Sequence, residues 1–151
     1  MTLSALVLVA TGTLAMAADV NVGMWKANMA KSKYSPGPAP RSQTLKIESW
    51  GANGVHYTMD GVSADGKPMH WEFQAQYDGK AVPFKGNPDA DMINYKRVDA
   101  NTIDSMTQLH GKDAMRAKVV FSADGKTRTL TQTGKNAKGQ DVNNLVVYER
   151  Q

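Results

Sequence analysis

Turn dipeptides that end in glycine divide the chain at short intervals, and this spacing limits the fold more than any other feature. They are Asn53-Gly54, Asp65-Gly66, Asp78-Gly79, Asp124-Gly125 and Lys138-Gly139. The runs between them are rich in Val, Ile, Thr, Tyr, Phe and Trp, and no long helical pattern separates them. Short strands joined by tight turns predict an antiparallel all-β protein built as a meander.

Ten strands are expected from these runs. They cover residues 22–26, 43–50, 54–62, 68–77, 80–84, 92–98, 102–110, 114–122, 127–134 and 143–150. A chain of this length forms one domain in most cases. A sheet with one apolar face is able to curl closed, which removes its unpaired edges. We therefore predict a single up-and-down barrel of eight to ten strands over residues 18–151.

The hairpin that turns at Gly66 has a register that the apolar pattern selects. A two-residue loop would oppose the polar Thr58 to Phe73 and would mix the two faces of the sheet. A three-residue loop opposes Met59 to Trp71 and gives Gly66 the left-handed position that follows a type I turn. We expect the three-residue loop.

The next hairpin favours a two-residue loop at Asp78-Gly79. That loop opposes Ala75 to Val82 and Phe73 to Phe84, so it predicts one continuous apolar face over three strands. The other face of this sheet is polar.

The hairpin around Asp124-Gly125 leaves two registers open. A two-residue loop opposes Val119 to Leu130 but also Phe121 to Arg128. A three-residue loop opposes Phe121 to Thr127 instead. The pattern of polar and apolar residues does not choose between them.

Two segments are expected to be loops. Residues 35–40, Ser-Pro-Gly-Pro-Ala-Pro, contain three prolines that remove three hydrogen-bond donors, so they cannot lie inside a sheet. We expect this segment to cover the mouth of the barrel. Asn87, Asp89 and Asp91 resemble the opening of a calcium loop, but the glycine and glutamate of that template do not follow. Turn formation is the expected role of these three residues, and no metal site is predicted.

The first residues have the composition of an export signal. Leu3 to Val9 form an apolar stretch without charge, and Ala15-Met16-Ala17 has the form of a signal-peptidase site. We predict a signal peptide over residues 1–17, and a periplasmic or secreted mature protein. The alternative is a buried first strand or helix. No later segment is apolar enough to cross a membrane.

The overall composition excludes several classes of site. The chain contains no cysteine, which rules out disulfides, thiolate metal sites and a cysteine nucleophile. Its net charge of +4 is spread over single Lys and Arg residues, so we expect no nucleic-acid partner. No G-x-S-x-G or phosphate-binding glycine loop is present, and we predict no cofactor. The oligomeric state is left open.

A short motif at the first strand resembles known barrels. Gly23-Met24-Trp25-Lys26 has the G-x-W pattern of the lipocalin and calycin families. The run from Lys31 to Pro38, K-S-K-Y-S-P-G-P, is similar to small exported bacterial proteins without a settled activity. The resemblance implies a lipocalin-like barrel in which Trp25 packs across the closed end. It also implies that a late basic residue, here Arg150, covers the ring of that tryptophan.

The three histidines are the candidates for acid–base chemistry. His70 is expected opposite Asp60 on the polar face, and such a pair is able to act as an acid–base unit. A solvated ion pair is the expectation, with no catalytic residue predicted. His56 lies on the same face, and His110 is expected to be exposed at a strand end. No spacing suits zinc, and haem ligation by one histidine is a weak alternative because none falls on the apolar face.

The apolar face supplies the candidate ligand site. Its inward side chains are predicted to be Tyr57, Met59, Trp71, Phe73, Phe84 and Tyr95, with Met106 and Tyr148 as further candidates. Ser and Thr near positions 105 and 107 and in 127–133 would add polar groups to the lumen. The leading hypothesis is an exported protein that binds a small lipophilic molecule. The alternatives are an enzyme that uses the same cavity and a non-catalytic envelope or stress protein with a solid core.

Overall fold

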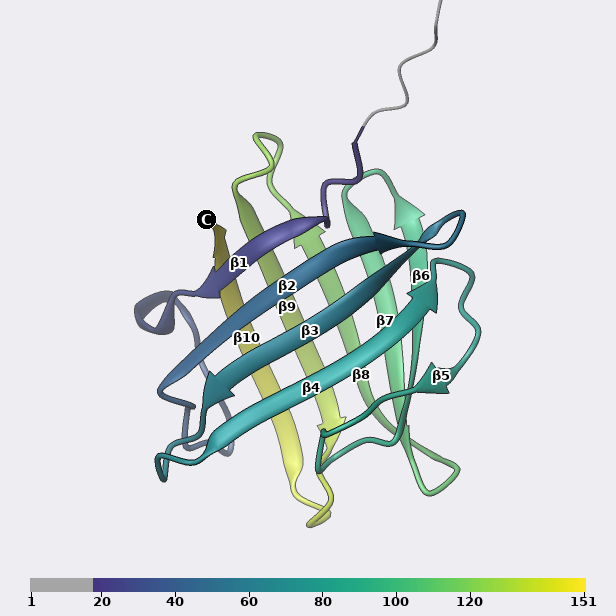
Figure 1. The fold of residues 1–151 in the computed structure, drawn as a ribbon. Coiled ribbons are helices and arrows are strands. Elements are labelled where there is room, and N and C mark those ends of the chain that lie inside the picture. The colour runs from purple at the N-terminus through teal and green to yellow at the C-terminus, as the bar shows by residue number, and fades with distance from the viewer. Residues whose placement is uncertain (1–17) are drawn as a thin grey trace, which may run out of the picture.

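The computed structural model describes residues 18–151 and consists of ten antiparallel strands with one short 3-10 helix (Figure 1). The helix is η1 (Met29–Lys31). The strands are β1 (Gly23–Ala27), β2 (Ser42–Trp50), β3 (Gly54–Val62), β4 (Pro68–Gln76), β5 (Val82–Pro83), β6 (Met92–Asp99), β7 (Thr102–Leu109), β8 (Lys112–Phe121), β9 (Thr127–Lys135) and β10 (Asp141–Arg150). The predicted signal peptide, residues 1–17, lies outside the described residues.

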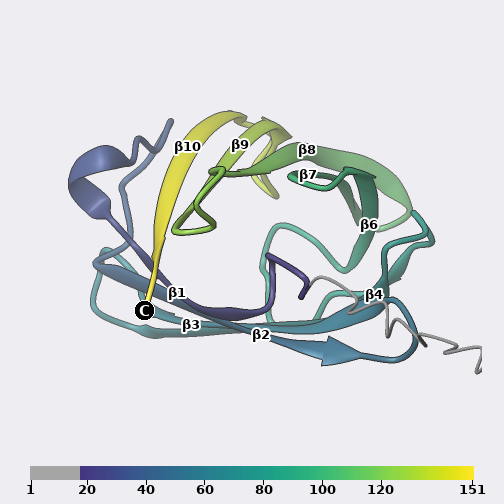
Figure 2. The same ribbon diagram turned by 90° about the horizontal axis from the view of Figure 1, so that it is seen from above.

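The strands form an up-and-down barrel that the first and last strands close. The order in the sheet is β4-β3-β2-β1-β10-β9-β8-β7-β6-β5. Every strand pairs with its neighbours in sequence except β4 and β5, which are the two ends of this order, and β1 also pairs with β10. Seen from above, β1 to β4 form one wall and β6 to β10 form the other (Figure 2). The predicted antiparallel meander barrel is confirmed.

The first predicted hairpin register is confirmed. Met59 lies opposite Trp71, and Tyr57 lies opposite Phe73. The backbone N–H of Ser63 donates to Lys67, which leaves three residues in the loop. Gly66 takes a φ of 88°, as the left-handed position of this turn requires.

The predicted pairing of Ala75 with Val82 is wrong. Val82 pairs with Ile93 of β6 instead, and the backbone N–H of Gly79 donates to Tyr95. Pro83 has no N–H to donate, so the chain after the turn makes only a two-residue strand. The seam between β4 and β5 is therefore the most weakly paired part of the barrel.

One bridge across this seam keeps the predicted register. Glu72 and Lys85 exchange two backbone hydrogen bonds, of 3.0 and 2.9 Å. The rings of Phe73 and Phe84, which the same register opposes, lie 5.4 Å apart at nearly a right angle. Side-chain packing thus continues across the seam where the strand ladder does not.

The open question at Asp124-Gly125 has a definite answer in the structure. Phe121 lies opposite Arg128, and Val119 lies opposite Leu130, which is the register of the two-residue loop. The side chains of Phe121 and Arg128 are both buried. A charged side chain therefore points into the barrel among apolar neighbours.

The interior of the barrel follows the alternation of each strand. Leu45, Ile47, Val55, Met59 and Val119 are all at most 1% exposed. On β7 the inward residues are Ile103, Ser105 and Thr107, so the expectation that Met106 points inward is wrong. Because Ile103 faces the core, period-two alternation turns Met106 outward. Over residues 18–151 the structure has no helix long and apolar enough to cross a membrane.

Candidate ligand-binding site

The start of β1 and the end of β10 close one end of the barrel. The ring of Trp25 is fully buried, and its Nε1 donates to the carbonyl of Asn21 at 3.0 Å. The guanidinium of Arg150 lies 4.1 Å from the centre of that ring. It also donates to the carbonyls of Val20, Val22 and Gly125. Trp25 and Arg150 thus occupy the places that the G-x-W resemblance implies.

The segment before β1 completes this closed end. Asp19 accepts a hydrogen bond from Tyr77 and forms an ion pair with Arg97 at 2.7 Å. Asn21 is fully buried, and its Nδ2 donates to the hydroxyl of Tyr77 at 3.1 Å. Burial and the hydrogen bond to Asp19 raise the pKa of Tyr77. Polar groups at this end are therefore paired with one another.

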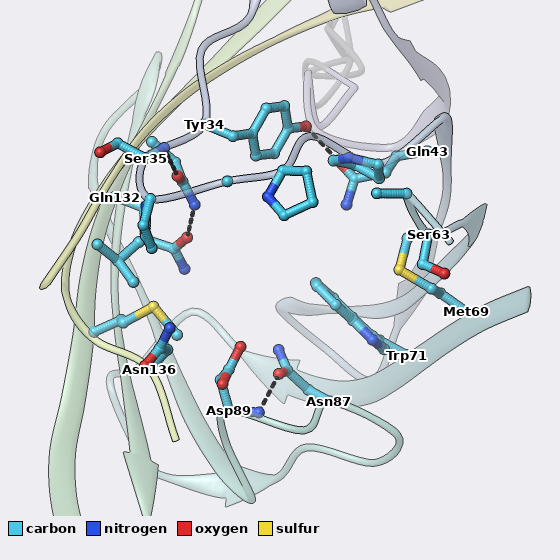
Figure 3. Close-up of a pocket in the computed structure, with 18 residues that line it drawn as sticks. Tyr34, Ser35, Gln43, Ser63, Met69, Trp71, Asn87, Asp89, Gln132 and Asn136 are labelled. Carbon is cyan, nitrogen blue, oxygen red and sulfur yellow. Dashed lines mark hydrogen bonds between the residues drawn. The ribbon is translucent and has the colours of Figure 1, made fainter. Parts of the chain in front are cut away.

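A cavity of about 250 Å³ opens at the opposite end, beneath the proline-rich segment (Figure 3). Pro36, Pro38 and Pro40 line it from one side, and Met69 and Trp71 of β4 line it from another. Residues 35–40 therefore lie at the mouth of the barrel, as expected.

Hydrogen bonds anchor the start of the proline-rich segment, among them one from the backbone N–H of Asn143 to the carbonyl of Ser35 at 2.9 Å. The hydroxyl of Tyr34 donates to Oε1 of Gln43 at 2.6 Å, and Ser35 donates its backbone N–H to Asn144 at 3.0 Å. Asn144 in turn donates to Gln132 at 3.1 Å, as Figure 3 shows. Burial raises the pKa of Tyr34 to about 12, so its hydroxyl stays protonated at neutral pH.

A second cavity, of about 110 Å³, lies deeper in the lumen. Five of the six predicted ligand contacts line it, namely Tyr57, Trp71, Phe73, Phe84 and Tyr95. The sixth, Met59, is fully buried but is not among the residues that line this cavity. Tyr57 stacks on Phe73 with ring centres 4.6 Å apart, and Phe73 meets Tyr95 edge-on at 5.0 Å.

The two cavities adjoin each other between the mouth and the lumen. The residues that line both are Tyr34, Gln43, Trp71, Asn87, Gln132 and Asn144. The lining is mainly aromatic at depth and carries amide side chains near the mouth. An apolar pocket with a few placed polar groups is typical of a small-molecule site.

Among the lumenal residues that sequence reasoning missed is a charged one, Arg128 of β9. Its side chain is 1% exposed and lines the deep cavity. Its Nη2 donates to the hydroxyl of Tyr95 at 3.1 Å, and its Nε contacts Oδ1 of Asn21 at 3.4 Å. The available signal was the two-residue loop at Asp124-Gly125, because only that register turns Arg128 inward together with Phe121.

The histidines lie outside the lumen. His70 Nδ1 contacts Asp60 Oδ1 at 2.7 Å, and both side chains are more than half exposed. His56 Nε2 contacts Glu72 at 2.8 Å on the same outer face. His110 is 85% exposed in the turn between β7 and β8. The expected solvated cross-strand pair of Asp60 and His70 is therefore present.

The side-chain oxygens of residues 87–91 accept hydrogen bonds from backbone N–H groups. Oδ1 of Asn87 accepts the N–H of Asp89, and Oδ1 of Asp89 accepts the N–H of Ala137. Asp91 accepts the N–H of His110. Across residues 18–151, no group of three or more His, Cys, Asp or Glu side chains converges on a metal position.

Comparisons with known proteins identify the fold alone. No protein-family description and no curated protein matches the sequence. Among solved structures, a mutant of the fluorescent protein UnaG is similar with a TM-score of 0.58 and 14% identity, over 87% of this chain and 96% of that one. Zebrafish ileal bile acid-binding protein, complexed with cholic acid, is similar with a TM-score of 0.51 and 11% identity, over 87% of this chain and 99% of that one.

A redesigned beta barrel is also similar. Its TM-score is 0.52 and its identity 11%, over 87% of this chain and 92% of that one. These likenesses each cover 87% of this chain and support a calycin-like fold.

Proposed function

We propose that this calycin-like barrel binds a small lipophilic molecule in its lumen. The observation that carries the proposal is a deep lumenal cavity lined by aromatic rings, which adjoins a second cavity at the mouth beneath residues 35–40. Burial of apolar ligand surface against such rings is favourable by about 25 cal/mol per Å². The similarity to a barrel solved with cholic acid supports the same class of ligand.

The size of the cavities limits how the ligand would lie. The deep cavity of about 110 Å³ is smaller than the roughly 300 Å³ at which drug-sized sites begin. The mouth cavity adds a space of about 250 Å³ above it. A ligand would therefore occupy both, with one end among the aromatic rings and the other beneath the proline-rich segment.

Tryptophan fluorescence tests this proposal with decan-1-ol as a neutral apolar probe. Trp71 lines both cavities. Trp50, the last residue of β2, lines neither of them and is 39% exposed. Decan-1-ol should change the emission of the wild type and of Trp50→Phe by the same saturable amount. Trp71→Phe should lose most of that change. No saturable change in any of the three proteins would overturn the proposal.

The enzyme alternative receives no support from the lining of the lumen. Of the described residues that line the deep cavity, none is a histidine, aspartate or glutamate. Asp60 and His70, the pair with acid–base potential, contact each other on the outer face. General acid–base catalysis most often uses a histidine or a carboxylate within hydrogen-bond reach of the substrate. Asp89, at the mouth, is the only such side chain among the described residues that line either cavity.

We also propose that the protein acts outside the cytoplasm after removal of residues 1–17. The composition of that segment supports this location. Cleavage after Ala17 would leave Asp19 and Asn21 near the new amino terminus, where both take part in the closed end of the barrel. The intact mass of the protein recovered from its native cells tests the cleavage. A mass that includes residues 1–17 would overturn it.

A further inference from the structure

Arg128 is a buried cation that the protein does not neutralise. Its side chain is 1% exposed, and none of the ion pairs formed within residues 18–151 includes it. A guanidinium cannot lose its proton under physiological conditions. The charge is therefore retained in a medium where an unpaired ion is costly.

The guanidinium also has unused hydrogen-bond capacity. Arginine carries five N–H donors in a planar fork. Nη2 of Arg128 donates to Tyr95, and Nε is 3.4 Å from Asn21, but Nη1 has no partner. It is the only fully buried side-chain nitrogen or oxygen without a partner in the part of the chain that the structure describes. Buried polar atoms in proteins are nearly always paired, so an exception calls for an explanation.

The side chains around Arg128 are neutral. Burial is the main cause that raises the pKa of Tyr57, Tyr95 and Tyr148, and the charge of Arg128 acts on all three in the opposite direction. These tyrosines therefore remain protonated at neutral pH and supply hydroxyl groups but no negative charge. The carboxylate of Asp19, in the neighbouring closed end, is already held by Arg97 and Tyr77.

A second donor stands beside the guanidinium. The ring of Tyr57 is buried and lines the deep cavity, yet its hydroxyl forms no hydrogen bond with any described residue. The hydroxyls of Tyr95 and Tyr148, by contrast, already contact Arg128 and Gln43. Arg128 and Tyr57 therefore both line the deep cavity, and each has a donor without a partner among the described residues.

We propose that Arg128 binds the carboxylate of the ligand, so that the natural ligand is a lipophilic carboxylic acid. A carboxylate has the charge and the two acceptor oxygens that suit the free edge of a guanidinium. Its apolar body would extend past Phe73 and Trp71 to the mouth. This inference rests on the proposed lumenal site and adds the chemical class of its occupant.

Three probes of equal chain length separate charge recognition from apolar binding. They are decanoic acid, methyl decanoate and decan-1-ol, each titrated below its aggregation limit and followed by calorimetry. The acid should bind the wild type about tenfold to a hundredfold more tightly than the ester, because charge-assisted hydrogen bonds contribute that much. Equal affinity of acid and ester would overturn the inference and leave the lipophilic site intact. Failure of all three probes to bind would count against both.

Arg128→Met removes the charge and keeps most of the side-chain volume. The variant should bind decanoic acid no more tightly than the wild type binds the ester, while its own affinity for the ester stays within about twofold. Arg116→Met is the matched control, since Arg116 is exposed on the outer face of β8 and its loss changes the net charge equally. Unchanged preference for the acid in Arg128→Met would overturn the assignment.

Tyr57→Phe keeps the test decisive if Arg128→Met does not fold. It removes only the free hydroxyl and keeps the ring that stacks on Phe73. The affinity for decanoic acid should fall several-fold, and that for methyl decanoate should change little. Equal losses for acid and ester would contradict a carboxylate at this position.

Discussion

The guanidinium of Arg150 lies 4.1 Å from the centre of the Trp25 ring, so the last strand covers the first at the closed end of the barrel. The same guanidinium donates to three backbone carbonyls, at Val20, Val22 and Gly125. Gly23 leaves room for it, because a Cβ at that position would overlap Nη1 of Arg150. The G-x-W motif therefore has a physical basis in this structure.

Arg150→Met should destabilise the protein by about 2–3 kcal/mol. The substitution removes a cation–π contact and leaves three partly buried carbonyls without their donors. The free energy of unfolding in urea measures the effect, with Arg116→Met as a surface control that should change it by less than about 0.5 kcal/mol. A loss as small as that of the control would show that Arg150 does not hold the closed end together.

Asp60→Asn should lower the pKa of His70. The hydrogen bond that the His70 ring donates to Asp60 is the largest cause that raises this pKa above 6.5, and the charge of Glu72 adds to it. A titration of the His70 ring protons by NMR measures the shift. Asp104→Asn, on the outer face of β7, is the control that should leave the titration unchanged.

The same pair has a defined effect on stability with pH. The pKa of His70 is higher in the folded protein than the value of 6.5 in the unfolded chain. The contribution of this ion pair to the free energy of unfolding is therefore complete below pH 6.5 and is lost as pH rises through the pKa of the folded state. Asp60→Asn should therefore reduce the stability difference between pH 5 and pH 8. An identical pH dependence in wild type and variant would contradict the contact.

All five tyrosines should resist ionisation in the folded protein. Burial is the largest cause that raises the pKa of each of them above 10, to about 12 for Tyr34. Unfolded tyrosines release their protons near pH 10. Stability is therefore lost as pH rises above 10, because the unfolded chain is then favoured by deprotonation.

Absorbance at 295 nm tests this expectation during an alkaline titration. The tyrosinate signal should appear together with the loss of the circular dichroism of the barrel, and not before it. In denaturant the same protein should titrate near pH 10. A tyrosinate step near pH 10 in the folded protein would show that at least one ring is more accessible than the structure has it.

Tyr34→Phe should speed the release of a lumenal ligand. The variant loses the 2.6 Å hydrogen bond to Gln43 that ties the proline-rich segment to β2, but keeps the ring. One hydrogen bond of this kind corresponds to about a threefold to tenfold change in rate. Stopped-flow dissociation of decan-1-ol measures it, and Tyr77→Phe at the closed end should leave the rate unchanged.

Much of the architecture was predictable because strand and turn signals are local. The alternation of Met69, Trp71 and Phe73 against the pattern of β3 was sufficient to select the three-residue loop at Gly66. The same rule did not succeed at Asp78-Gly79. After that turn, the chain pairs with β6 and not with β4. The alternation of β4 and β5 does not indicate which of two neighbouring strands β5 will pair with.

The position of Arg128 was not predictable from polarity. A charged residue opposite Phe121 counted against the two-residue loop, although that register is the one observed. The charge is accommodated by the hydroxyl of Tyr95 and by Asn21, which come from distant parts of the chain. Polarity patterns fail at such positions because they assume that every inward side chain is apolar.

The class of the fold, a strand number of eight to ten, the register at Gly66 and the aromatic character of the interior could all be predicted from the amino-acid sequence. These features depend on contacts between neighbouring strands, which period-two alternation and turn residues specify. The cavity at the mouth and the unpaired guanidinium in the lumen emerge only from the folded barrel. Both depend on the closure of β1 onto β10, which brings residues more than a hundred positions apart into contact.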